Sequence, residues 1–311
     1  MKTSRILTLL LAGMFGLTGP TAWANLRAPR RADGYLSGGL RIILPPGAVR
    51  LAREDMRIVF PAFNSGTPFR DAAVSFEIVY EFENATEKIL RFPVRFVAVD
   101  IRGLEARLNA AEIIPVLGAD AAEESECLSR LADHRRAFLE PLYRPFLQTL
   151  KPDAPAEAKF ASIFGPFPVG DGTKPEFRTA GLTIALRPGR NTLVLRYRQR
   201  PFVAEYGHGY TAAWPARGFT GFDYLLYPAM SWEAGRDFRF SLNVEIPYYE
   251  GKFIFFPRWE EPRTKSNVDL REVKSVRPHV RLLSAEFDRW PAAVLTVLVW
   301  FDKKALSRLP E

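Results

Sequence analysis

Three carboxylates in the second half of the chain are the first candidates for catalysis. Glu205, Asp223 and Asp237 lie within one short stretch. A glycosidase needs two carboxyl groups about 5 to 10 Å apart, one protonated and one ionised. With Asp223 or Glu205 as the acid and Asp237 as its partner, the protein would hydrolyse a polysaccharide or peptidoglycan of the cell envelope. Because the spacing leaves the distance between the carboxyls open, the hydrolase is our alternative hypothesis.

Aromatic side chains crowd the same stretch and favour ligand binding. Glycines beside His208 let the backbone approach a ligand closely. Tyrosine and tryptophan rings stack on sugar faces while their polar edges form hydrogen bonds. Alternatively, these rings fill the junction between two β domains. The candidate binding residues are Tyr206, His208, Tyr210, Trp214, Asp223 and Trp232.

Other catalytic chemistry has little support in the residue pattern. The single cysteine, Cys127, would need a positioned base to act as a nucleophile, and His134 lies nearly two helical turns away from it. The three histidines are widely separated, with no HExxH motif or Cys/His cluster. No phosphate-binding loop and no GxSxG nucleophile elbow occurs either. We therefore expect no metal and no cofactor.

Basic side chains accumulate towards the C-terminus. Such a surface could bind an anionic glycan or a partner protein, although basic residues on strands also protect sheet edges from strand addition. The chain carries a formal net charge of +8 but shows no basic helix or recognised nucleic-acid motif, so we expect no nucleic acid as partner. The residues concerned are Arg196, Arg198, Arg200, Arg258, Arg263, Lys265, Arg271, Lys274, Arg277 and Arg281.

The first 24 residues have the order of a secretory signal peptide. Lys2 and Arg5 precede an apolar run, and Ala22-Trp23-Ala24 supplies a small-residue cleavage site before Asn25. Cleavage after Ala24 would place the mature protein in the periplasm or outside the cell. The apolar core is too short to span a bilayer stably, and we expect no transmembrane segment in the mature chain.

Alternation of apolar and polar residues predicts mainly β structure. Val74, Phe76, Ile78, Tyr80 and Phe82 alternate with polar residues, as in a strand with one solvated face. The turn after this run and the apolar run at 89–99 predict a hairpin. Similar alternation recurs at 182–198, 238–246, 280–287 and 294–300.

One segment departs from this pattern. Leucines and a phenylalanine at near-helical spacing predict an α-helical insertion at about 119–150, docked on a β domain by its apolar stripe. We predict two β-sandwich-like antiparallel domains, one over 25–200 that carries the insertion and a smaller one over 201–311. A single continuous sandwich is the alternative.

Short motifs along the mature chain resemble uncharacterised secreted bacterial β-sandwich proteins, known only as domains of unknown function. The motifs are Tyr80-Glu81-Phe82-Glu83-Asn84, Phe92-Pro93, Pro188-Gly189-Arg190-Asn191 and the Tyr227-to-Trp232 segment. The resemblance implies an envelope β protein and carries over no catalytic residue. With no catalytic motif beside many stacking and cationic residues, we expect a non-enzymatic protein that binds an envelope protein or a glycan.

Overall fold

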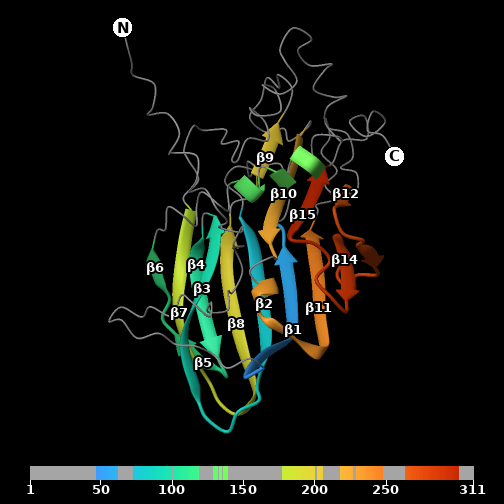
Figure 1. Ribbon diagram of the computed structural model, residues 1–311. Helices are drawn as coiled ribbons and strands as arrows, with labels where there is room; N and C mark the ends of the chain where they lie inside the picture. The colour runs from blue at the N-terminus through green and yellow to red at the C-terminus, as the bar shows by residue number, and fades with distance from the viewer. Residues whose placement is uncertain are drawn as a thin grey trace, which may run out of the picture.

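The computed structural model describes eleven stretches of the chain, and they form mainly β-strands in three sheets (Figure 1). None of the helices in these stretches is long and apolar enough to cross a membrane. The stretches are 47–61, 73–99, 101–118, 129–131, 133–134, 136–138, 177–199, 202–205, 218–226, 229–247 and 263–300.

The largest sheet has eight strands in the order β13-β14-β11-β1-β2-β8-β4-β5. Its neighbours pair antiparallel except β1 and β11, which run parallel. The strands are β1 (Val49–Val59), β2 (Val74–Asn84), β4 (Arg102–Leu108), β5 (Ala111–Ile113), β8 (Gly189–Gln199), β11 (Glu233–Pro247), β13 (Arg271–Val273) and β14 (Val280–Phe287).

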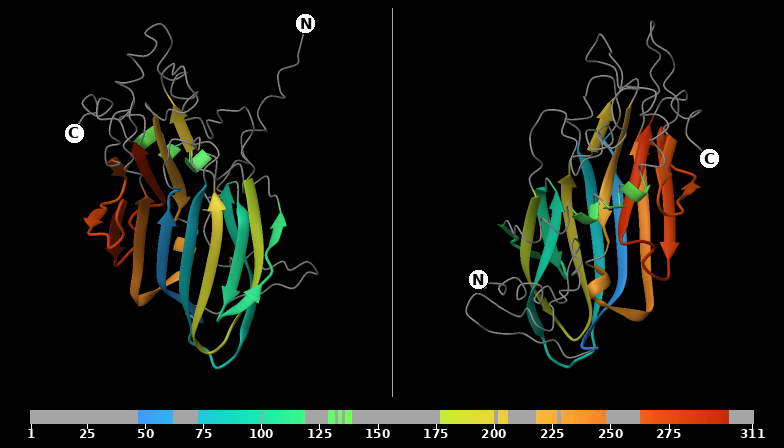
Figure 2. Two further views of the ribbon diagram at one scale, coloured as in Figure 1. Left: turned by 180° about the vertical axis from the view of Figure 1, so that it is seen from behind. Right: turned by 45° about the horizontal axis from the view of Figure 1, so that its top comes forward.

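Two smaller sheets complete the described structure. One has four strands in the order β12-β15-β10-β9, and the other has three in the order β3-β7-β6. They lie at the upper right and at the left of Figure 1, and Figure 2 shows them from two further sides. The strands are β3 (Leu90–Val99), β6 (Val116–Gly118), β7 (Phe177–Leu186), β9 (Phe202–Glu205), β10 (Gly218–Leu225), β12 (Arg263–Ser266) and β15 (Val294–Trp300), with a short 3-10 helix η2 (Ala229–Ser231) before β11.

Alternation in the sequence matches alternation in burial, so the prediction of mainly β structure is confirmed. Along β2 the five apolar residues from Val74 to Phe82 are buried, and most of the residues between them are only partly exposed. On β15, Leu295, Val297 and Val299 face the hydrophobic core. A residue period of two places every second side chain on one face, which is the face that each sheet buries.

Side chains on the core faces of β2 and β8 contact both smaller sheets. Phe76 stacks on Tyr197 of β8 at 4.7 Å between ring centroids and meets Phe222 of β10 edge-on at 5.4 Å. Tyr197 in turn contacts Phe96 of β3 at 5.2 Å. All three sheets therefore share one core on the same side of β2 and β8.

The predicted hairpin between β2 and residues 89–99 is wrong. The strand β2 pairs with β1 and β8, while β3 leaves for the three-stranded sheet and pairs with β7. The buried Asn84 supports this crossing, because its Nδ2 donates to the carbonyl oxygens of Lys88 and Leu186 at 2.8 and 3.1 Å. Its Oδ1 accepts the amide of Thr86 at 3.0 Å. A turn rich in polar residues suits a crossing between sheets as well as a hairpin, so the sequence signal did not separate the two.

A second buried asparagine stabilises the return crossing from β7 to β8. Asn191 accepts the amide of Arg187 at 2.9 Å and donates to the carbonyls of Arg187 and Gly189 at 2.7 and 3.0 Å. Gly189 has a φ of 82°, a conformation that residues with a Cβ rarely adopt. Asn191 and Phe82 are paired across β8 and β2, so both crossings lie at the same end of the sheet.

The eight-stranded sheet contains strands from both sides of residue 200, where we predicted the boundary between two domains. The eight-stranded sheet takes β1, β2, β4, β5 and β8 from before this position and β11, β13 and β14 from after it. The expectation of antiparallel pairing throughout is wrong at β1 and β11, because parallel pairing leaves no hairpin signal in the sequence. The division into two β domains stays a prediction that this sheet order does not support.

The predicted helical insertion lies largely outside the described residues. Within it, residues 129–131, 133–134 and 136–138 are helical. Leu131 is only 2% exposed, so its side chain is buried. The extent of the insertion stays a prediction.

Replacing Phe76 by alanine should destabilise the whole fold, because this ring contacts both the neighbouring strand and the four-stranded sheet. We expect a loss of about 3–5 kcal/mol in the free energy of unfolding, as for other buried phenylalanines. Urea denaturation followed by circular dichroism measures it. The matched control is Val79→Ala, on the opposite, partly exposed face of the same strand. Equal losses for the two variants would contradict a core on one side of β2.

Candidate functional site

The structure describes some residues of the predicted aromatic site but not others. Tyr206, His208, Tyr210 and Trp214 lie outside the described residues. Asp223 and Trp232 are described, and both are buried, at 9% and 5% exposure. The structure therefore places the two described members inside the protein.

Trp232 belongs to the core, which corrects its prediction as a ligand-stacking ring. It follows η2 and packs against Phe82 of β2 at 4.7 Å and Phe92 of β3 at 6.0 Å between ring centroids. A ring enclosed in this way stabilises the contact between sheets and has no free face for a sugar. The residue type is evident from the sequence, but its burial is not.

Asp223 takes part in a hydrogen-bond chain on the face of β10 opposite the core. The Thr296 hydroxyl donates to Asp223 Oδ1 at 2.5 Å, and His134 Nε2 lies 2.7 Å from the same hydroxyl oxygen. Because the hydroxyl has a single hydrogen, His134 is the donor to Thr296. His134 comes from the helical residues and stacks on Phe138 at 5.8 Å. The chain joins the helical segment to β15 and β10.

The candidate catalytic carboxylates are not brought together in the described structure. Asp223 is on β10 of the four-stranded sheet, whereas Asp237 is exposed on β11 of the eight-stranded sheet. The side chain of Glu205 and the whole of Cys127 lie outside the described residues. Among the described residues, no group of three histidine, cysteine, aspartate or glutamate side chains could hold a metal ion.

Three of the basic residues singled out in the sequence form ion pairs. Arg196 contacts Glu77 at 2.6 Å, and Arg281 contacts Glu272 at 2.8 Å. Arg277 pairs with Glu245. These carboxylates offset the positive charge, which favours the interpretation of a solvated sheet surface. Arg198, Lys265, Arg271 and Lys274 are exposed, while Arg200, Arg258 and the side chain of Arg263 lie outside the described residues.

Glu245 is the most enclosed carboxylate of these ion pairs. It accepts a hydrogen bond from Arg57 at 2.7 Å as well as one from Arg277. Burial by itself would raise the pKa of Glu245, but the hydrogen bonds and charges of the two arginines outweigh it and lower the pKa below its usual value. The ionised form of Glu245 therefore stabilises the folded state.

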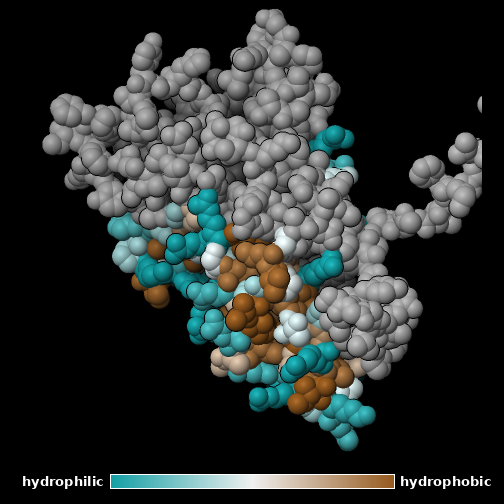
Figure 3. Space-filling view, turned by 90° about the vertical axis from the view of Figure 1, so that its left-hand side faces the viewer, coloured by the Kyte–Doolittle hydropathy of each residue, from teal (hydrophilic) through white to brown (hydrophobic). Residues whose placement is uncertain are grey.

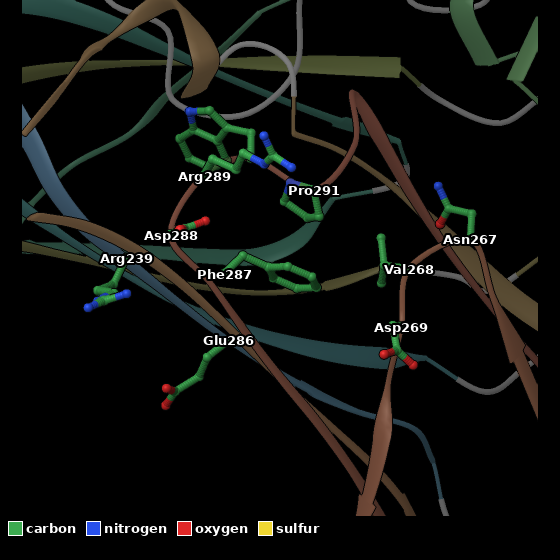
Figure 4. Close-up of a pocket in the computed structure, with 10 residues that line it drawn as sticks. Arg239, Asn267, Val268, Asp269, Glu286, Phe287, Asp288, Arg289 and Pro291 are labelled. Atoms are coloured by element: carbon green, nitrogen blue, oxygen red, sulfur yellow. The ribbon is translucent and has the colours of Figure 1, made fainter.

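A groove of about 950 Å³ opens beside the end of β14, where no sequence motif predicts a site. Figure 4 shows the Phe287 ring pointing towards the space between Val268 and Pro291, while Glu286 and Arg239 point to the other side of β14. One wall comes from β14 and the turn after it, with Glu286, Phe287, Asp288, Arg289, Trp290 and Pro291. The other comes from the loop residues Asn267, Val268 and Asp269, and Arg239 of β11 completes the lining.

Rings from the core hold the aromatic wall of the groove in place. Trp290 packs on Phe238 and Phe240 of β11 at 4.6 and 5.6 Å between ring centroids. Phe287 stacks on Phe240 at 6.0 Å. Phe238 and Phe240 are fully enclosed, whereas Phe287 and Trp290 are half-buried. The groove therefore presents rings that are already fixed before any ligand arrives.

The opposite wall is fixed by hydrogen bonds to β15. Asn267 donates from Nδ2 to the carbonyl of Val294 at 2.6 Å, and its Oδ1 accepts the amide of Thr296 at 2.8 Å. The hydroxyl of Ser266 donates to the Thr296 carbonyl at 2.9 Å and accepts the amide of Val268 at 3.3 Å. Both ends of the Asn267 amide are used in this way, so its role is to position the loop that carries Asp269.

A further surface feature is apolar. Ile114, Val116 and Leu117 are 82%, 72% and 45% exposed. They lie where the chain passes from β5 to β6, which are end strands of the eight-stranded and three-stranded sheets. The side of the molecule on which these sheets end carries an apolar region with hydrophilic residues around it (Figure 3). Exposed apolar side chains beside sheet edges are suited to contact with another protein.

No protein-family model matches the sequence, and no curated protein matches it significantly. Among solved structures, a Legionella pneumophila protein described as nutrient-binding aligns with a TM-score of 0.45 and 10% identity, over 84% of this chain and 69% of its own. An M1 zinc metallopeptidase from Deinococcus radiodurans gives 0.35 and 12%, over 82% and 43%. Yeast LTA4 hydrolase gives 0.38 and 7%, over 82% and 29%. The function must be inferred from the residues of this chain.

Replacing Glu245 by glutamine should reduce stability at neutral pH and have little effect in acid. The pKa of Glu245 is lower in the folded state, so its contribution is complete above the pKa of an ordinary glutamate, about 4.3, and is lost as the pH falls through the folded-state pKa. We expect a loss of about 1–3 kcal/mol at pH 7, measured by urea denaturation, that shrinks towards pH 3.

The matched control is Glu77→Gln, which removes a more exposed partner of an arginine. Exposed ion pairs contribute only about 0–1 kcal/mol, so this variant should stay close to the wild-type protein at both pH values. An equal loss for Glu245→Gln at pH 7 and pH 3 would show that charge is not the cause.

Proposed function

We propose that this chain is an exported, non-enzymatic β-sheet protein that binds a glycan or a partner protein in the periplasm or outside the cell. The signal-peptide pattern of residues 1–24 supports export. The groove beside β14 is the observation that carries the binding function. Its volume is at the upper end of the range of about 300–1,000 Å³ found for small-molecule sites.

The architecture proposed for this function is a β-sandwich. The rings of Phe96 and Phe222, one from each smaller sheet, contact the same face of β2 and β8. This arrangement supports two layers around one core, with the helical residues docked on the outer face of the four-stranded sheet through His134. A rigid layered scaffold suits a binding protein, because its loops can be held in fixed positions.

The environment of Asp223 supports binding over hydrolysis. A catalytic acid must reach its substrate, but Asp223 is 9% exposed and accepts a hydrogen bond from Thr296, which is fully buried. Asp237 lies in another sheet. The alternative function is hydrolysis of a cell-envelope polysaccharide or peptidoglycan, with Asp223 or Glu205 as the acid and Asp237 as its partner. The variant Asp223→Asn distinguishes the two functions.

Export can be tested with residues 1–24 fused to alkaline phosphatase that lacks its own signal. This reporter is active only where its disulfides form, outside the reducing cytoplasm. We expect activity from the fusion and a strong reduction when Lys2 and Arg5 are both replaced by glutamate, because the basic region is part of the targeting signal. Activity no higher than that of the reporter alone would contradict export.

Binding and hydrolysis can be separated with purified envelope material from the producing bacterium. The protein should sediment with this material without releasing reducing ends. Digesting the material with protease beforehand distinguishes the two ligand classes, since only glycan binding survives. Asp223→Asn should leave sedimentation unchanged and lower the melting temperature, because it weakens a buried hydrogen bond worth about 1–3 kcal/mol.

Two outcomes would overturn this proposal. A wild-type protein that stays in the supernatant has no such binding partner. Release of reducing ends that Asp223→Asn abolishes at an unchanged melting temperature would instead establish the hydrolase.

A further inference from the structure

We propose that the groove beside β14 binds a neutral oligosaccharide, with Phe287 and Trp290 as stacking surfaces and Asp269 as a hydrogen-bond acceptor for sugar hydroxyls. This inference rests on the proposed binding function and names its ligand class and its site. It differs from the sequence expectation, which placed the binding residues between Tyr206 and Trp232.

The aromatic wall of the groove is suited to stacking on sugar rings. Sugar rings expose apolar C–H faces that pack on aromatic rings, and stacking is favoured when the rings do not have to be ordered on binding. Trp290 and Phe287 are fixed by Phe238 and Phe240 behind them. They remain half-buried, so part of each ring faces the groove.

The charges around the groove favour a neutral ligand. Arg239 and Glu286 point to the other side of β14, which leaves Arg289 against Asp269 and Asp288 and gives the groove side a formal net charge of −1. This sign is opposite to that of the whole chain, at +8. A polyanion would be repelled by the two carboxylates of Asp269 and Asp288, whereas hydroxyl groups both donate and accept hydrogen bonds and can use both kinds of side chain.

The position of Asp269 completes the site. It follows directly on the loop that Ser266 and Asn267 tie to β15. Asp269 is exposed and belongs to the lining of the groove. A hydrogen-bonding group that is positioned before binding loses little entropy when the ligand arrives.

Isothermal titration calorimetry on the full mature chain tests the inference. The probes are cellohexaose, maltohexaose and the hexamer of N-acetylglucosamine as neutral ligands, and polygalacturonate as an anionic one. We expect at least one neutral hexasaccharide to bind, with an affinity that changes less than about twofold between low and high salt, because no ion pairs are formed. Polygalacturonate should not bind.

Two groove variants and one control locate the site. Asp269→Ala and Trp290→Ala should each weaken binding about tenfold, as expected for a charge-assisted hydrogen bond and a stacked ring. Asp269 is exposed, so this variant keeps the test meaningful even if Trp290→Ala unfolds. Glu112→Ala changes another exposed carboxylate, on β5 and outside the groove lining, and should bind like the wild-type protein.

The remaining outcomes overturn the inference in different ways. Neutral saccharide binding that survives in Asp269→Ala moves the site away from the groove but leaves the proposed function standing. Salt-sensitive binding of polygalacturonate alone overturns the ligand class. If no saccharide binds while the protein still sediments with envelope material only before protease digestion, the inference fails and the proposed function holds through a protein partner.

Discussion

The core face of β2 is the feature on which the rest of the structure depends. Phe76 contacts rings of β8 and β10, the Tyr80 hydroxyl lies 3.3 Å from that of Tyr224 on β10, and Phe82 packs on Trp232. Burial raises the pKa of Tyr224 well above its usual value, with smaller contributions from the neighbouring tyrosines and Glu54, so its hydroxyl stays protonated and available for this hydrogen bond. Tyr197 of β8, which stacks on Phe76, contacts Phe96 of β3, so a single connected set of side chains joins all three sheets.

Thr296 connects two regions that are far apart in the sequence. Its side chain bonds Asp223 and His134, while its backbone bonds the Asn267 side chain and the Ser266 hydroxyl. The residue that anchors the helical segment therefore also anchors the loop on one wall of the groove. A shift of β15 at this position would move the loop that carries Asp269. The shape of the groove is thus tied to the packing of the four-stranded sheet and not only to the residues that line it.

Strands were predictable from the sequence, but their partners were not. The alternation at Val74 to Phe82 reflects a local period of two, which any half-buried strand must show. Whether β2 pairs with β3 or with β8 depends on contacts between distant residues, and the polar turn at Asn84 is compatible with either. The same limit applies to sites. Asp223 and Trp232 have residue types common in binding sites, yet their burial follows from neighbours on other strands. The groove is formed by Asp269, Phe287 and Trp290 from separate loops and strand ends, which come together only in the folded chain.

The parallel pairing of β1 with β11 has a consequence for how the protein acquires its fold. Arg53 pairs with Arg239, so the centre of the largest sheet joins residues separated by 186 positions. Contacts of such long range slow the folding reaction, because the entropy cost of closing a large loop must be met before the contacts can stabilise the chain. A chain of this topology cannot complete its main sheet while its C-terminal half is still being synthesised. The largest sheet therefore stays incomplete until β11 is available to pair with β1.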